Sequence, residues 1–90
     1  MNGAKHWTVT IDIDERDPQT RAEATLERSG PVGTITGEGL ARCSPTDGAI
    51  PQIGDEVAAA RALSDLAHKL LEAASEDIQT STHRPAHLWA

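Results

Sequence analysis

Residues 6–14 read HWTVTIDID, and apolar and polar side chains alternate strictly along them. The large apolar residues of this stretch all fall on one face: Trp7, Val9, Ile11 and Ile13. A period of two with β-branched residues is typical of a strand with one buried face. The stretch therefore predicts the first strand of a sheet. We expect a loop from residue 15 to residue 19, because Pro18 removes a backbone donor.

Two further segments have strand character. Residues 20–28 alternate between small or apolar and charged side chains. Alanine and glutamate also suit a helix, but the Ser-Gly-Pro turn that follows favours a strand. Residues 33–43 predict a third strand. Ile35 and Leu40 are five residues apart, so in a regular strand their side chains would lie on opposite faces. We therefore expect a β-bulge at Gly37 and Gly39 to restore the phase.

A helix is predicted from residue 56 to residue 75, with Gly54 and Asp55 at its N-cap. Ile50 and Ile53 are expected in the preceding loop, where they would cover the end of the core. Its expected apolar stripe recurs at three and four residues: Ala59, Leu63, Leu66, Ala67, Leu70 and Ala74. Charged residues occupy the other side. The order β-β-β-α predicts one α+β domain over residues 6–88, a three-stranded antiparallel sheet with the C-terminal helix or helices on one face.

Size and composition limit how the chain can be stabilised and where it works. It has 90 residues, a formal net charge of −6, two tryptophans and no phenylalanine. So thin a core is marginal alone, and we expect a homodimer. The apolar residues Leu88 and Trp89 are expected to pack on this chain or on a partner. One cysteine, Cys43, and no secretory or membrane-spanning stretch indicate a cytoplasmic protein without a membrane role.

Residues capable of chemistry are scattered. His83 and His87 are separated by Pro85, and no carboxylate or cysteine joins them at a ligand spacing, so no metal site is predicted. The glycines around Glu38 do not complete a dinucleotide motif, and we expect no cofactor. No nucleophile, base and oxyanion site come together, so the chain is not expected to be an enzyme. The acidic residues at the end of the first strand favour a solvated edge that discourages aggregation: Asp12, Asp14, Glu15 and Asp17.

Candidate interaction residues lie on the helix and beyond it: Arg61, Asp65, Lys69, His83 and Arg84. On a helix, Arg61 with Asp65 and Asp65 with Lys69 are four residues apart and can form ion pairs. Arg61 and Asp65 could recognise a partner, or they could form an ordinary surface pair worth under about 1 kcal/mol.

Several segments, taken in order, carry a family resemblance: HWTV (6–9), IDIDE (11–15), TRA (20–22), GLAR (39–42), IGDE (53–56), ARALSDL (60–66), DI (77–78) and THRPA (82–86). This set resembles an actinobacterial dsRBD-like family, the domain of unknown function 1876. That family includes mycobacterial dormancy-associated proteins that resemble hibernation promoting factor. The resemblance implies a β-β-β-α core, a homodimer and a role in silencing translation during stress.

The charge pattern departs from that of a true double-stranded-RNA-binding domain. Such a domain carries lysines at the start of its helix, where this chain has Asp55 and Glu56. We therefore expect weak or no binding to free nucleic acid. The expected function is that of a non-enzymatic, stress-associated binding protein whose target is the ribosome or another protein. The alternative is a dimeric protein–protein interaction module with no nucleic-acid role.

Overall fold

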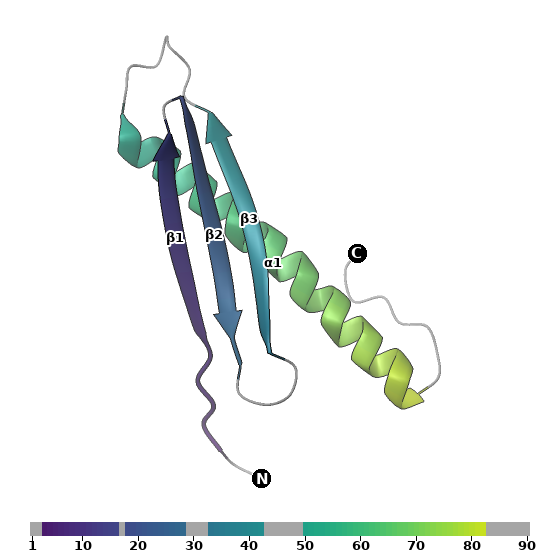
Figure 1. Ribbon diagram of the computed structural model, residues 1–90. Helices are drawn as coiled ribbons and strands as arrows, with labels where there is room; N and C mark the ends of the chain where they lie inside the picture. The colour runs from purple at the N-terminus through teal and green to yellow at the C-terminus, as the bar shows by residue number, and fades with distance from the viewer. Residues whose placement is uncertain (1–2, 17, 29–32, 43–49, 83–90) are drawn as a thin grey trace.

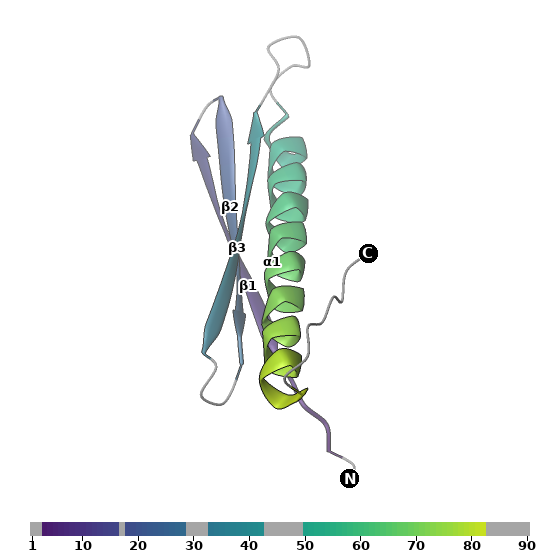
Figure 2. The ribbon, with the colours of Figure 1, turned by 90° about the vertical axis from the view of Figure 1, so that its right-hand side faces the viewer.

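The computed structural model describes residues 3–16, 18–28, 33–42 and 50–82. Three strands, β1 (Thr8–Arg16), β2 (Gln19–Glu27) and β3 (Thr34–Arg42), are followed by one helix, α1 (Pro51–Thr82). The strands form an antiparallel sheet in the order β1-β2-β3. Figures 1 and 2 show α1 lying diagonally across one face of this sheet. The predicted α+β fold is therefore confirmed.

The hairpin between β1 and β2 is tighter than the sequence predicts. Arg16 pairs with Gln19, so β1 continues through residues that we expected to form a loop. The pairing also sets which side chains share a face, because directly opposed residues of an antiparallel pair point the same way. Val9, Ile11 and Ile13 lie opposite Leu26, Ala24 and Ala22 on the side of the sheet that α1 covers.

The predicted bulge in β3 is absent. Residues 34–42 pair with residues 27–19 without interruption, so Leu40 falls on the outer face of the sheet, where it is exposed. Gly37 and Gly39 serve a different purpose. A Cβ added at either position would clash with the backbone of α1, at Leu66 and Ala62 for Gly37 and at Ala58 and Ala62 for Gly39. The glycines therefore let the helix approach the strand closely.

The helix starts earlier than the predicted N-cap at Gly54 and Asp55 and ends later than the predicted residue 75. Proline is favoured at the first helical position, because its missing N–H would have no intrahelical partner there. Ile53 thus lies within α1, and Ile50 precedes it. Both are more than half exposed and do not cover the core.

The buried face of α1 is rotated from the predicted stripe. Leu66, at 5% exposed, is buried as predicted, and Leu70 packs partly against the core, but Leu63 is 41% exposed and Ala67 is exposed. The core contains mostly alanines: Ala22, Ala24, Leu26, Ala41, Ala58, Ala62 and Leu66. Because these side chains are small, α1 lies near the backbones of β2 and β3, against which it mainly packs. β1 is left at the uncovered margin of the sheet.

Candidate interaction surfaces

Charged side chains of α1 bond to the free backbone edge of β3. Arg61 Nη1 donates to the carbonyl oxygen of Leu40 at 2.7 Å, and Lys69 Nζ donates to the carbonyl oxygen of Thr36 at 2.8 Å. β3 is an edge strand of the described sheet, so these carbonyls have no neighbouring strand to bond. The helix supplies the donors that a fourth strand would otherwise supply.

Asp65 completes this row between the two cations. Its Oδ2 accepts the backbone N–H of Glu38 at 2.9 Å and lies 3.2 Å from Lys69 Nζ. The hydrogen bond from the Glu38 N–H and, second, the one from Lys69 hold the pKa of the Asp65 carboxyl below its ordinary value. We call Arg61, Asp65 and Lys69 the edge clamp.

The edge clamp corrects one sequence expectation and confirms another. We expected these residues on the side of the helix away from the sheet, but their side chains reach β3. The Asp65–Lys69 ion pair is confirmed, whereas Arg61 bonds to Leu40. The two other candidate interaction residues, His83 and Arg84, lie outside the described residues, as do Leu88 and Trp89 of the tail.

The opposite edge of the sheet has no clamp among the described residues. Residues of a strand point their N–H and C=O groups alternately to either side. Thr36, Glu38 and Leu40 point theirs outward from β3. The register of the three strands relates this alternation in β3 to that in β1. In β1, the odd-numbered residues point their backbone N–H and C=O groups to the open edge.

An apolar stripe runs along this open edge, on the helix side of β1. Its members are between 37% and 50% exposed: Trp7, Val9, Ile11 and Ile13. The sequence pattern predicted a buried face here. It could not show that β1 would be an edge strand beyond the reach of α1, because alternation does not specify the order of the strands.

A cation lies at one end of the apolar stripe. The Arg28 guanidinium carbon lies 5.6 Å from the ring centroid of Trp7, within the range of a cation–π interaction. Arg28 Nε and Nη2 are buried and have no hydrogen-bond partner among the described residues. A buried guanidinium without an acceptor is costly, so this end of the stripe is suited to an incoming carboxylate.

Two acids lie at the other end. Glu15 and Asp55 are joined by a side-chain hydrogen bond, and that bond, then the charge of Asp55, raises the pKa of Glu15 above its ordinary value. Within the described part of the chain, the buried Oδ1 of Asp55 has no hydrogen-bond partner. This end of the stripe therefore lacks a cation, and the two ends are complementary in charge.

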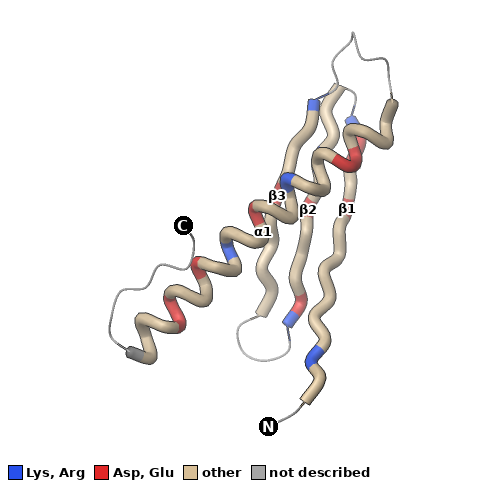
Figure 3. The backbone as a smooth tube through the Cα atoms, turned by 180° about the vertical axis from the view of Figure 1, so that it is seen from behind, with Lys and Arg blue, Asp and Glu red and all other residues tan. Residues whose placement is uncertain are grey.

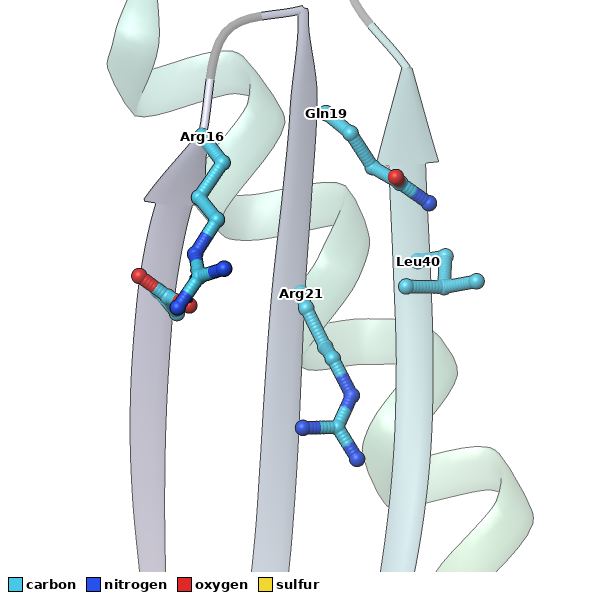
Figure 4. Close-up of a pocket in the computed structure, with 5 residues that line it drawn as sticks. Arg16, Gln19, Arg21 and Leu40 are labelled. Carbon is cyan, nitrogen blue, oxygen red and sulfur yellow. Dashed lines mark ion pairs between the residues drawn. The ribbon is translucent and has the colours of Figure 1, made fainter.

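The outer face of the sheet has a shallow hollow near the β1–β2 hairpin, shown in Figure 4. Its cations already have acidic partners. Arg16 Nε lies 2.8 Å from Asp14, and Arg21 pairs with both Glu23 and Glu38. The bond to Glu38 is the main reason that the pKa of Arg21 is raised. The remaining lining residues are Gln19 and Leu40.

Over the described residues, the charged side chains form neither a basic stripe along α1 nor a cluster of metal ligands. Figure 3 shows acidic and basic positions interspersed along α1 rather than a basic stripe. No three His, Cys, Asp or Glu side chains gather there in a way that could hold a metal ion. His68 Nδ1 lies 3.0 Å from the carbonyl oxygen of Ser64, whereas Cys43, His83 and His87 lie outside the described part of the chain. Within that same part, no helix is both long and apolar enough to span a bilayer.

Comparison with known proteins places this architecture among mycobacterial relatives. The family model described as Rv2632c-like matches residues 5–87. The chain is 49% identical over 89 residues to the uncharacterized protein Rv2632c of Mycobacterium tuberculosis, covering 94% of each. It is 48% identical over 84 residues to the uncharacterized protein Mb1767 of Mycobacterium bovis, covering 93% of this chain and 87% of that protein. The crystal structure of Rv2632c superposes with a TM-score of 0.81 at 46% identity, covering 93% of this chain and 98% of that one.

Proposed function

The chain belongs to the Rv2632c-like family, and from this premise we propose that it acts as a homodimeric, non-enzymatic binding protein. The observation that carries the proposal is the difference between the two edges of the sheet. The edge clamp occupies the outward backbone groups of β3, whereas the open edge of β1 combines the apolar stripe with backbone groups that no described strand pairs. The second copy would join at β1.

A second copy suits this surface because pairing is self-complementary. Two β1 strands in antiparallel contact would join the two sheets into one of six strands and bring their apolar stripes together. Each stripe is now 37–50% exposed at its large side chains, in a protein whose own core is mostly alanine. Dimerisation would thus supply the apolar burial that the single chain lacks.

The test is the mass in solution of the full chain and two lysine variants. Light scattering at micromolar concentration should give twice the 9.6 kDa chain mass. Ile11→Lys places a charge within the stripe and should yield the monomer. Its matched control is Thr10→Lys, which adds the same charge on the outer face and should remain a dimer. A wild-type monomer across this concentration range would contradict the proposal.

The proposed target of the dimer is the ribosome, bound in the cytoplasm during stress or dormancy to silence translation. The family resemblance of the sequence supports this, and the cations for rRNA contact would come from Arg16, Arg21 and Arg42 on the outer face of the sheet. Co-sedimentation of purified ribosomes with the protein tests it. Binding through phosphates should weaken steeply between 50 and 200 mM salt, as is general for such contacts.

The alternative target is a basic protein, bound with no nucleic acid involved. The formal charge of −6 and the acidic partners already held by Arg16 and Arg21 favour this candidate. Nuclease treatment distinguishes the two targets. Binding that survives removal of all RNA from an extract indicates the protein partner, and binding that is lost with the RNA indicates the ribosome.

A further inference from the structure

The cation at one end of the apolar stripe and the acidic pair at the other cannot meet within one chain. Arg28 lies over Trp7, the residue directly before β1, whereas Glu15 lies near the far end of β1, beside Asp55 of α1. Eight residues of extended strand separate Trp7 from Glu15, a span of roughly 26 Å. An antiparallel second copy reverses the direction of the strand, so it brings the end of its own β1 to the beginning of this one.

We propose that two copies pair through β1 with Ile11 opposite Ile11, so that Arg28 of each copy binds Glu15 of the other. This inference rests on the homodimer proposed above and specifies its register. Glu15 of the second copy would lie directly opposite Trp7, beside the ring that Arg28 covers. The contact gives Arg28 a carboxylate acceptor and gives the acidic pair a cation.

The same register also gives the other side chains of β1 suitable partners across the two strands. On the helix side, Val9 faces Ile13 of the second copy, so the apolar stripes pair along their length. On the outer face, Thr10 lies opposite Asp12 of the second copy, and no two carboxylates face each other. Ile11 is odd-numbered and presents its N–H and C=O to the open edge, so two copies of Ile11 exchange both backbone bonds.

Neighbouring registers place less favourable side-chain pairs opposite each other. Moving the centre to Asp12 places the two Asp12 carboxylates directly opposite, which is destabilising for like charges on one face. Moving it to Thr10 sets Ile13 beside Trp7, and Arg28 no longer meets Glu15. A shift by a single residue of one strand places an apolar side against a polar side.

The test is a charge exchange between two variants of the full chain. Arg28→Glu and Glu15→Arg each create two repulsive contacts in a homodimer, so each should raise the dimer dissociation constant by about tenfold or more. An equimolar mixture restores both contacts: the introduced glutamate of one chain meets the introduced arginine of the other, and the native Glu15 and Arg28 form the second contact. The mixture should return to near wild-type affinity. Circular dichroism confirms that each variant is folded.

Matched controls change charge by the same amount elsewhere. Arg42→Glu lies on the outer face of β3, and Glu72→Arg lies on an exposed position of α1. Both should dimerise as the wild type does. Single variants that dimerise normally, or a mixture that fails to recover, overturn the register. A monomeric wild type overturns the homodimer itself, and the two failures are thereby distinguished.

Cross-linking checks the register without altering a charge. In a Cys43→Ser background, Ile11→Cys would face its own copy at a Cα separation of about 5.5 Å, suitable for a disulfide. Val9→Cys would face Ile13 and should not cross-link. An oxidised dimer from the Ile11→Cys protein alone supports the proposal, and cross-linking of the Val9→Cys protein alone contradicts it.

Discussion

Lys69 Nζ lies 2.8 Å from the carbonyl oxygen of Thr36, so a helix side chain occupies the edge of a strand where another strand could pair. Arg61 makes the equivalent bond to Leu40 at 2.7 Å. Exposed edges invite pairing with other chains, and natural sheets cover or charge them. We therefore expect the edge clamp to disfavour strand pairing at β3 and to leave the β1 edge as the side where a strand can add.

Removing the edge clamp should open this second edge. The variant Arg61→Ala/Asp65→Ala/Lys69→Ala leaves the outward backbone groups of β3 without protein partners, and we expect it to form larger assemblies than the dimer. Sedimentation velocity across a concentration series measures this. The control Glu72→Ala removes a charge from an exposed position of α1 and should leave the assembly unchanged. Identical sedimentation of the two variants would show that the clamp does not protect the edge.

Gly37 should tolerate no side chain. In Gly37→Ala the new Cβ meets the backbone of Leu66 and Ala62, which cannot rotate away, so α1 must move off the sheet. Overpacking of this kind costs about 1–3 kcal/mol or more. Urea unfolding measures the loss. Gly3→Ala has open space around the added Cβ and serves as the control.

The strands could be predicted because alternation is a strong signal in this chain. Trp7, Val9, Ile11 and Ile13 specify one face, and that face is indeed the helix side of β1. What could not be predicted is that the face stays half-exposed. The exposure of this face depends on the order of the strands and on the diagonal path of α1. Both are set by contacts between residues that are far apart in the sequence.

The helix was predicted in the right place, and Leu66 was correctly predicted to be buried, but the buried face as a whole is rotated toward Ala58 and Ala62. Alanines at 58, 59, 62 and 67 make several faces similarly apolar, so the leucines at 63, 66 and 70 dominate the pattern. Packing is decided on the sheet instead, where Gly37 and Gly39 receive the backbone of Ala58, Ala62 and Leu66. The glycines were interpreted as a bulge, so the signal for close helix approach was missed.

Leucine truncations test the observed phase of α1. Leu66 is 5% exposed and belongs to the core, whereas Leu63 is 41% exposed. Leu66→Ala should cost roughly 2–5 kcal/mol, and Leu63→Ala should cost clearly less, about 1 kcal/mol. For a domain of this size, each kcal/mol lowers the melting temperature by about 4–8 °C. Thermal melts of the two variants measure the difference. A larger fall in melting temperature for Leu63→Ala would show that the helix face predicted from the sequence is the buried one.

The pair formed by Glu15 and Asp55 predicts an unusual dependence of stability on pH. The hydrogen bond with Asp55, then its charge, raises the pKa of Glu15 in the folded chain. A raised pKa means that the folded state holds the proton more tightly than the unfolded state does. This contribution to stability is therefore complete below the unfolded pKa and is lost as pH rises through the folded pKa.

Arg28 of a second copy would lower the pKa of Glu15 again in a dimer. The pH dependence of stability should therefore be measured in the Ile11→Lys variant, which is expected to be monomeric. Adding Asp55→Asn should flatten the pH dependence of its unfolding free energy above the ordinary glutamate pKa, where a carboxylate of raised pKa titrates. Adding Glu56→Gln, which neutralises the next residue of α1, should leave that dependence in place. If Asp55→Asn changes nothing, the two carboxyl groups do not share a proton in the folded chain.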